Sequence, residues 1–260
     1  FSLFVEDRWV VNKKLTVEAG LRFDRDGLAR QNAIAPRLSF LYLPLRNNAT
    51  IIRGGIGLFY DRAPMSVGYF GQLPERTVTT FGADGSSIAD GPRRFANRVG
   101  ARLHNPRSVR ASLQIDLPIT KNLTGRIGYL QRSTIDDFIV DSIEGLGEGA
   151  LVLSNLGRAR YRELQLLAVY DNPITGKWNA SYVWSNAQGD LNSVDNFLGD
   201  FPAFVVRPNE YGPQPFDARH RFLAYGQLRA RYDIDISPLV EIRSGFPFSL
   251  AIPCRLFISR

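Results

Sequence analysis

The residues best equipped for chemistry stand close together near the end of the chain: Asp217, Arg219, His220 and Arg221. A carboxylate, an imidazole and two guanidinium groups could hold a polar ligand at the rim of a structure. In a β-strand, however, alternate side chains share a face, so Asp217, Arg219 and Arg221 can also pair with neighbouring strands. We therefore favour an ion-pair network at the start of a strand. Ligand binding by the four residues is the second interpretation. His220 is expected on the opposite, apolar face.

Two further groups of residues suggest a metal or phosphate site. The carboxylates of one segment could bind calcium, but their spacing does not match an EF-hand; they are Asp136, Asp137, Asp141 and Glu144. The segment RGGIGLFYDR (Arg53–Arg62) is rich in glycine, but it lacks the Lys-Ser/Thr ending and the following helix of a phosphate-binding loop. We predict a solvated acidic loop and a barrel strand, with no metal site and no cofactor.

The histidine and cysteine counts leave little material for catalysis. The chain has two histidines and one cysteine, Cys254, which cannot form an internal disulfide. The sequence shows no nucleophile-elbow motif around any Ser, His or Asp. We predict that the chain is not an enzyme.

Charge and hydropathy exclude two other classes of protein. The net charge is +7, but the 32 Lys and Arg residues are spread along the chain among 25 acidic residues. Because no basic block forms, we predict no nucleic-acid partner. No run reaches the ~18–20 apolar residues that a transmembrane helix needs, which excludes a helical membrane protein.

The main pattern in the sequence is a period of two residues. Apolar and polar residues alternate in segment after segment, so each segment has one apolar and one polar or charged face. These segments are Lys14–Asp24, Val109–Leu117, Asn122–Tyr129, Glu163–Tyr170, Trp178–Ser185 and Arg219–Arg231. Less regular strands are expected at Phe1–Val11, Ala35–Leu45, Ile51–Asp61 and about Ile234–Arg243. The pattern predicts an all-β protein of roughly ten strands, each near the ~9–11 residues that cross a bilayer at a tilt.

Short and long connections alternate between these strands. Short turns rich in Asn, Pro and Lys are expected at Asn12–Lys13, Pro44–Asn48, Pro118–Asn122 and Asn172–Lys177. Long polar loops are expected at Arg62–His104, Asp136–Gly157 and Gln188–Phe216. Outer-membrane barrels are connected in this way, with short periplasmic turns and long extracellular loops.

A soluble β-sandwich also alternates, but two details favour an antiparallel transmembrane β-barrel. A water-filled lumen can hold charged groups without a desolvation cost. The polar faces carry such charges at Glu18, Arg22, Arg53, Arg110, Asp116, Arg126, Glu163, Arg219, Arg221 and Arg229. Aromatic residues near the ends of apolar rows are typical of interfacial girdles. They stand at Trp9, Phe23, Tyr60, Tyr129, Tyr170, Trp178 and Trp184.

Several blocks, in order, resemble the barrel of TonB-dependent transporters of the Oar-like type. The first is FVEDRWVVNKKLTVEAGLRFDRD (Phe4–Asp26), which is similar to a strand pair of that family. It is followed by APRLSFLY (Ala35–Tyr42) and TIIRGGIGLFYDR (Thr50–Arg62). The later blocks are YRELQL (Tyr161–Leu166), ASYVWSNA (Ala180–Ala187), FDARHRF (Phe216–Phe222) and SGFPFS (Ser244–Ser249).

The resemblance implies a barrel of about twenty-two strands with an N-terminal plug, which imports a scarce, bulky solute with energy passed through TonB. No plug or TonB-contacting segment is recognisable, and Phe257–Arg260 lack a terminal aromatic residue. We therefore expect residues 1–260 to be part of a single barrel domain, without the plug and the barrel C-terminus. The expected location is the outer membrane. The expected partners are the lipid bilayer, lipopolysaccharide, the TonB complex through the plug, and a siderophore, oligosaccharide or peptide.

Two alternatives to the transporter remain open from the sequence. One is a membrane barrel without a plug that acts as a porin or adhesin. The other is a soluble β-sandwich that binds carbohydrate or protein.

Overall fold

The computed structural model describes residues 1–25, 27, 32–45, 50–100, 103–144, 148–173, 176–194, 206, 208–229 and 234–248. Cys254 and Phe257–Arg260 lie outside these residues, as do parts of the predicted loop Gln188–Phe216. The side chains of Glu144 and Arg229 also lie outside the described part.

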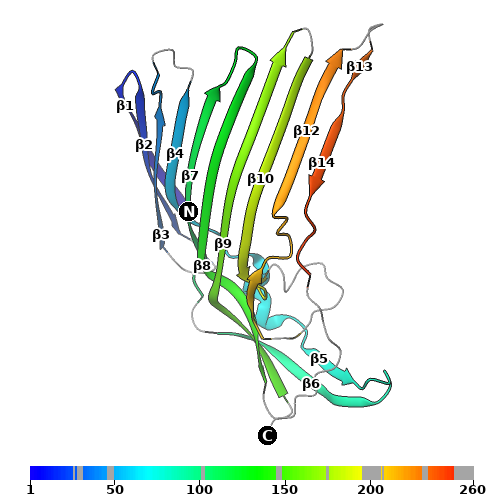
Figure 1. Cartoon of the computed structure of the whole chain (residues 1–260). Helices are drawn as coiled ribbons and strands as arrows, with labels where there is room; N and C mark the ends of the chain where they lie inside the picture. The colour runs from blue at the N-terminus through cyan, green and yellow to red at the C-terminus, as the bar shows by residue number, and fades with distance from the viewer. Residues whose placement is uncertain are drawn as a thin grey trace.

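The described residues form one curved sheet whose strands follow one another in chain order (Figure 1). The central path is β1-β2-β3-β4-β7-β8-β9-β10-β12-β13, with β5, β6, β11 and β14 attached beside it. The bounds of the path strands are β1 Ser2–Asn12, β2 Leu15–Arg25, β3 Asn32–Tyr42, β4 Ile51–Tyr60, β7 Arg107–Pro118, β8 Leu123–Glu144, β9 Glu148–Asn172, β10 Gly176–Asp190, β12 His220–Arg229 and β13 Asp235–Ile236. The attached strands are β5 Arg76–Phe81, β6 Ile88–Val99, β11 Tyr211–Pro213 and β14 Leu239–Arg243.

This arrangement confirms the predicted all-β, antiparallel fold of a partial barrel. Apart from the parallel pair β6–β9, the paired strands run antiparallel within the described residues. The path forms one continuous curved wall instead of the two packed sheets that a β-sandwich requires. The sandwich alternative is therefore not supported.

The strand register separates the wall into a polar face and an apolar face, as the alternation predicts. Residues directly opposite each other on paired strands point to the same side. Ile115, Ile127 and Leu166 are linked in this way across β7, β8 and β9. On the other side, Asp116 lies opposite Arg126, one residue along from the apolar row.

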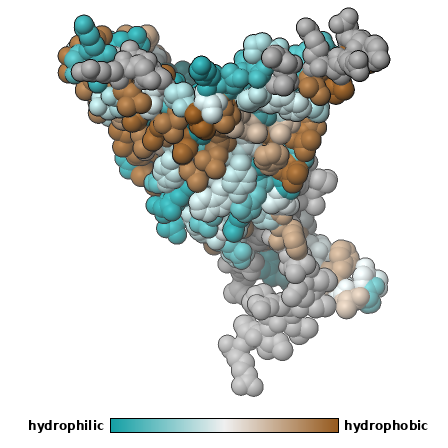
Figure 2. All heavy atoms as spheres, turned by 45° about the horizontal axis from the view of Figure 1, so that its top comes forward, coloured by the Kyte–Doolittle hydropathy of each residue, from teal (hydrophilic) through white to brown (hydrophobic). Residues whose placement is uncertain are grey.

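The apolar face carries large side chains in an exposed belt. We define this apolar belt by the rows within Leu15–Phe23 of β2, Ile34–Tyr42 of β3, Leu123–Tyr129 of β8, Leu164–Tyr170 of β9 and Trp178–Trp184 of β10. Ile34 is 54% exposed, and Leu166 is 41% exposed. At ~3.4 Å per residue and a tilt of ~40°, the row in β2 spans about 21 Å, close to the ~25 Å apolar band of membrane barrels. On the face seen in Figure 2, hydrophobic residues gather below a hydrophilic rim.

The two ends of the wall differ in their connections. At the upper end in Figure 1, which we call the short-turn end, tight turns join β1 to β2 and β7 to β8, and only three residues separate β9 from β10. The first turn is fixed by the Asn12 carboxamide, whose Oδ1 accepts hydrogen bonds from the backbone N–H of Lys14 (2.8 Å) and Leu15 (3.0 Å). The opposite end, the loop end, carries the longer segments. The predicted alternation of short and long connections is thus observed.

For two of the three segments predicted as long loops, the prediction is nevertheless wrong, because these segments contain regular secondary structure. Arg62–His104 contains the helix α1 (Met65–Tyr69), the 3-10 turn η1 (Phe70–Gln72) and the hairpin β5–β6. Asp136–Gly157 is the continuation of β8 and β9 beyond the wall. Within the described residues, no helix is long and apolar enough to span a membrane.

Strands β8 and β9 bend where they leave the wall. The register shifts between Ile135 and Ile139, and Asp136 adopts a left-handed conformation with φ 59°. An extra residue in one strand bends that strand and disrupts the ladder locally. A Cβ at the facing Gly157 would lie 2.7 Å from the Asp137 carbonyl oxygen, so the bend requires glycine there.

The extensions of β8 and β9 build a separate core at the loop end. Its buried members are Val67, Phe70, Phe95, Phe138, Val140, Leu151, Leu153 and Val194. We call this cluster, with the elements that carry it, the loop-end unit. The loop end is therefore a folded structure with its own core.

The tip of the β5–β6 hairpin is held by a carboxylate. The Ser87 hydroxyl and the N–H groups of Ser87 and Ser86 donate hydrogen bonds to the Asp84 carboxylate and lower its pKa to about 2.

Truncating the centre of this core should open the loop-end unit and leave the wall intact. In the full-length protein, Phe70→Ala removes a fully buried ring and should cost about 3–5 kcal/mol of local stability. Hydrogen exchange of the β5 and β6 amides should then accelerate, while the β2 amides keep their protection. The matched control Phe81→Ala removes a ring that is 54% exposed and should change neither. Unaltered protection of β6 in the Phe70→Ala variant would disprove the independent core.

Candidate functional site

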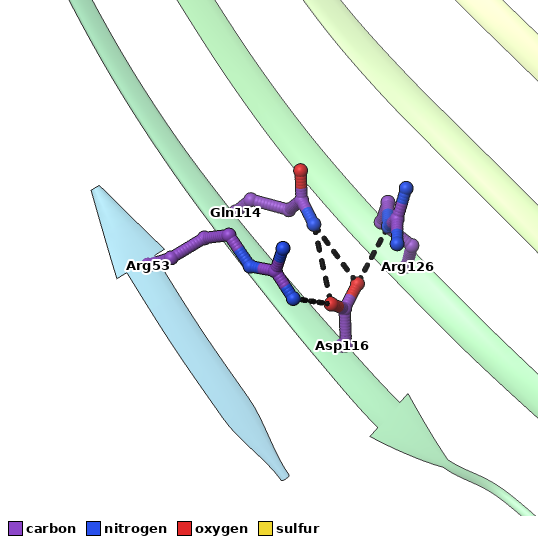
Figure 3. Close-up of polar contacts among 4 residues, drawn as sticks. All are labelled: Arg53, Gln114, Asp116 and Arg126. Atoms are coloured by element: carbon purple, nitrogen blue, oxygen red, sulfur yellow. Dashed lines mark hydrogen bonds and ion pairs between the residues drawn. The ribbon is translucent and has the colours of Figure 1, made fainter. Parts of the chain in front are cut away.

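The polar face of the wall holds a carboxylate clamped between two arginines. Asp116 in β7 accepts hydrogen bonds from Arg53 Nη2 in β4 (2.7 Å, to Oδ2) and from Arg126 Nε in β8 (2.6 Å, to Oδ1). Gln114 Nε2 lies 3.1 Å and 3.2 Å from the two carboxylate oxygens (Figure 3). Side chains from three strands, β4, β7 and β8, thus donate hydrogen bonds to the two oxygens of one carboxylate.

The register explains how these side chains meet. Arg126 lies directly opposite Asp116, whereas Arg53 lies opposite Gln114, one same-face step away from Asp116. Such direct and diagonal neighbours are within reach of long side chains. The Asp116 side chain is 12% exposed, and those of Arg53 and Arg126 are 45% and 38% exposed. The carboxylate is thus largely shielded, and an arginine contacts each of its two oxygens.

The same face is hollowed beside this clamp. A hollow of about 660 Å³ is lined on the polar face by Arg8, Glu18, Arg53, Gln114, Glu163 and Gln165, among others. Arg8 and Glu18 form an ion pair across β1 and β2, and Ser39 Oγ donates to Glu18 Oε2 (3.2 Å). Three of the predicted polar-face charges, Glu18, Arg53 and Glu163, therefore line this hollow.

A second hollow, toward the loop end, has an excess of positive charge. Its volume is about 400 Å³, and five arginines but only two aspartates line it: Arg22, Arg25, Arg37, Arg62, Arg110, Asp24 and Asp61. The guanidinium carbons of Arg37 and Arg110 each lie 4.8 Å from the centre of the Phe59 ring. Stacking on a ring holds a guanidinium in place with its N–H groups free for an anion. This hollow suits anionic groups.

The four candidates near the end of the chain are divided between two sides of the wall. Arg219 Nε lies 3.5 Å from Asp217 Oδ2, and the backbone N–H of Ala187 donates to Asp217 Oδ1 (3.0 Å). The Asp217 side chain is buried, so it ties β10 to the start of β12. His220 pairs with Trp184 on the apolar face, where its Nδ1 lies 2.7 Å from the Tyr182 hydroxyl. Arg221 lies opposite Val183 on the polar face. A role of these residues in ligand binding stays a prediction.

The acidic residues considered for calcium do not converge. Asp136 forms an ion pair with Arg107 (2.9 Å), and Asp141 Oδ1 accepts from the backbone N–H groups of Ser142 and Asn209. Among the residues that the structure describes, no group of three or more His, Cys, Asp and Glu side chains could hold a metal ion. The glycine-rich segment from Arg53 lies in β4, where a Cβ at Gly54 would lie 2.8 Å from the Phe40 ring. Close packing in a strand accounts for Gly54.

Known proteins resemble the chain in structure and not in sequence. No family model and no curated protein sequence matches it. Its fold is similar to that of the siderophore receptor PirA from Pseudomonas aeruginosa, with a TM-score of 0.60, 16% identity, and coverage of 95% of this chain and 42% of PirA. A mutant of the ferric enterobactin receptor PfeA from the same organism gives a TM-score of 0.64, with 16% identity, and coverage of 92% of this chain and 31% of PfeA. The outer membrane transporter YddB from Escherichia coli gives a TM-score of 0.59, with 16% identity, and coverage of 87% of this chain and 30% of YddB.

The fold is similar to part of the β-barrel of these three proteins. The chain spans between 30% and 42% of the length of these three proteins. All three are named as receptors or transporters.

Removing the clamped carboxylate should weaken the wall measurably. In the full-length protein in detergent micelles, Asp116→Asn leaves Arg53 and Arg126 without their counter-ion. We expect a loss of about 1–2 kcal/mol in the free energy of unfolding by urea, since the two guanidinium groups are partly solvated. The control Asp90→Asn breaks an exposed ion pair with Arg93, and its effect should stay below ~0.5 kcal/mol. Equal effects of the two variants would show that the clamp is no stronger than a surface pair.

Proposed function

We propose that this chain is part of the barrel wall of an outer-membrane TonB-dependent receptor that takes up a bulky solute. The observation that carries the proposal is the two-faced wall: a charged, hollowed face on one side and an exposed apolar belt of bilayer height on the other. The polar face lines the lumen in this proposal, and the belt contacts lipid. The structural likeness to receptors and transporters supports it.

The edges of the sheet support a larger barrel. All the residues of β1 are exposed, and no strand pairs with its outer edge within the described residues. In a bilayer, an unpaired strand edge leaves several polar backbone groups without partners, each at a cost of several kcal/mol. We propose that further strands close this wall and that residues 1–260 are part of a single barrel domain. We propose in addition that a plug fills this barrel and that the plug contacts TonB.

The loop end faces the outside of the cell in this proposal, because outer-membrane barrels carry their longer connections there. The loop-end unit would then be the first part of the wall to meet the solute. The arginine-lined hollow near the loop end of the wall favours a solute with anionic groups. A siderophore is one such solute; oligosaccharides and peptides with acidic groups are others. We propose the Oar-like type of receptor because the sequence blocks between Phe4 and Ser249 resemble that type and occur in its order.

A matched pair of arginine substitutions tests which face contacts lipid. Leu166 lies in the middle of the apolar belt, and its neighbour Gln165 lines the hollow on the polar face. In the full-length protein, Leu166→Arg should cost about 2–4 kcal/mol of stability in the bilayer, while Gln165→Arg should cost little. Folding into the outer membrane, measured by heat-dependent gel mobility, reports the difference. An equal or reversed effect would contradict the assignment of the faces.

Conductance separates a plugged receptor from a porin. A plug blocks the lumen, so the full-length protein reconstituted in a planar bilayer should show no steady open-channel current. A persistent current in the absence of any added solute would favour the plugless porin, in which the same charged polar face lines an open channel.

A further inference from the structure

Two arginines of β9 stand on the apolar face instead of in the lumen. The apolar row of β9 runs through Tyr170, Ala168, Leu166 and Leu164, and the next two positions of the same row are Arg162 and Arg160. Both side chains are exposed. They lie toward the loop end, directly beyond the apolar belt.

The neighbours of these arginines are neutral and polar. Arg162 lies between Gln131 of β8 and Asn186 of β10, and Arg160 lies between Ser133 and Gln188 of the same two strands. Amide and hydroxyl groups donate hydrogen bonds without adding negative charge. The four neighbours therefore extend the cationic pair into a surface rich in donors.

Neither arginine has an internal counter-ion. Within the residues that the structure describes, the side chains of Arg160 and Arg162 make no hydrogen bond or ion pair. Glu163 borders the same region, but it belongs to the polar face, where its carboxylate accepts a hydrogen bond from the Tyr161 hydroxyl. Further toward the loop end, Asp136 is paired with Arg107 (2.9 Å), and Asp190 accepts from Asn209 Nδ2 (2.7 Å). The positive charge is left for an external anion.

The arginines also border a hollow with aromatic walls. Tyr129 and Trp184 flank Leu164 on either side, at the last belt position before Arg162. The hollow beside them has a volume of about 370 Å³ and is lined by both arginines, both aromatic rings, Asn186 and Gln188, among others. Amphipathic rings mark the depth at which lipid headgroups begin. Arg162 lies one same-face step beyond that depth, and Arg160 lies two steps beyond it.

We propose that Arg160 and Arg162, with Asn186 and Gln188, bind a phosphate group of an outer-leaflet glycolipid. The site rests on the proposed function, because it needs the apolar belt in lipid and the loop end outside. Guanidinium groups bind phosphate through paired, charge-assisted hydrogen bonds. The acyl chains of the same molecule continue onto Leu164 and Leu166 of the belt. One lipid thus satisfies both the charge and the apolar surface beside it.

The test measures binding of lipid A with two phosphates to the purified full-length protein in detergent micelles. Arg160→Gln/Arg162→Gln removes both charges and keeps polar side chains, and it should weaken binding about tenfold. Lipid A stripped of its phosphates should bind the unaltered protein as weakly as intact lipid A binds the variant. Inorganic phosphate alone separates a lipid site from a site for free anions, and it should displace lipid A only at far higher concentration.

The matched control removes two charges from the other end of the wall. Lys13 and Lys121 are exposed in turns at the short-turn end, and Lys13→Gln/Lys121→Gln changes the net charge by the same amount. This variant should bind lipid A as the unaltered protein does. Heat-dependent gel mobility of each variant first establishes that its barrel is folded.

Each outcome bears on the proposal. Equal binding by the arginine variant and the unaltered protein would overturn the site, and so would an equal loss in the lysine control. Displacement of lipid A by inorganic phosphate at matching concentration would show a site for free anions instead. If the unaltered protein itself failed to insert into the outer membrane, the proposed function would fail, whereas an inserted barrel with unchanged lipid binding would refute only the lipid site.

Discussion

The ladder of backbone hydrogen bonds that runs from β1 to β12 is the constraint on which the rest of this structure depends. Its register is continuous over most of each strand pair, with ten to fourteen paired residues in β1–β2, β2–β3, β4–β7, β7–β8 and β9–β10. Because side chains alternate with a period of two, a slip of one residue would move every charge of a strand to the apolar face. The polar hollows, the apolar belt and the arginine pair of β9 are all consequences of this one register.

The charges of the polar face are compatible with the wall because they are organised in pairs. Asp116 joins three strands through Arg53 and Arg126, while Arg132 of β8 reaches Asp61 beyond β4 at 2.7 Å. Ion pairs beside water contribute little each, so this arrangement fixes specificity more than it adds stability. The hollow nearer the loop end departs from the rule, since its arginines outnumber its aspartates. Unbalanced positive charge around such a hollow attracts anions from solution.

The sequence predicts the wall well and the loop end poorly, and the difference has a physical cause. Strands with one wet and one apolar face alternate, as in Leu15–Arg25, and this period is visible without a structure. The runs Phe138–Val140 and Leu151–Leu153 lie in the loop-end unit, mostly buried on both sides, so they are continuously apolar and lose the period. Helix α1 has five residues, too few for a helical period to appear. The Asp116 clamp was visible only as separate charged residues, because β4 pairs with β7 across an insertion whose length hides the contact.

The place where the apolar row of β9 ends is the most informative break in the alternation. From Tyr170 to Leu164 the row is apolar, and at Arg162 it becomes cationic while the strand continues unbent and paired on both sides. In the proposed barrel, a change of solvent along a continuously paired strand explains this break, because the same face would pass from hydrocarbon to headgroups over one same-face step. The rows in β8 and β10 change at the same level, from Tyr129 to Gln131 and from Trp184 to Asn186. Three adjacent strands therefore agree on one boundary, which a random scatter of polar residues over a soluble surface would not produce.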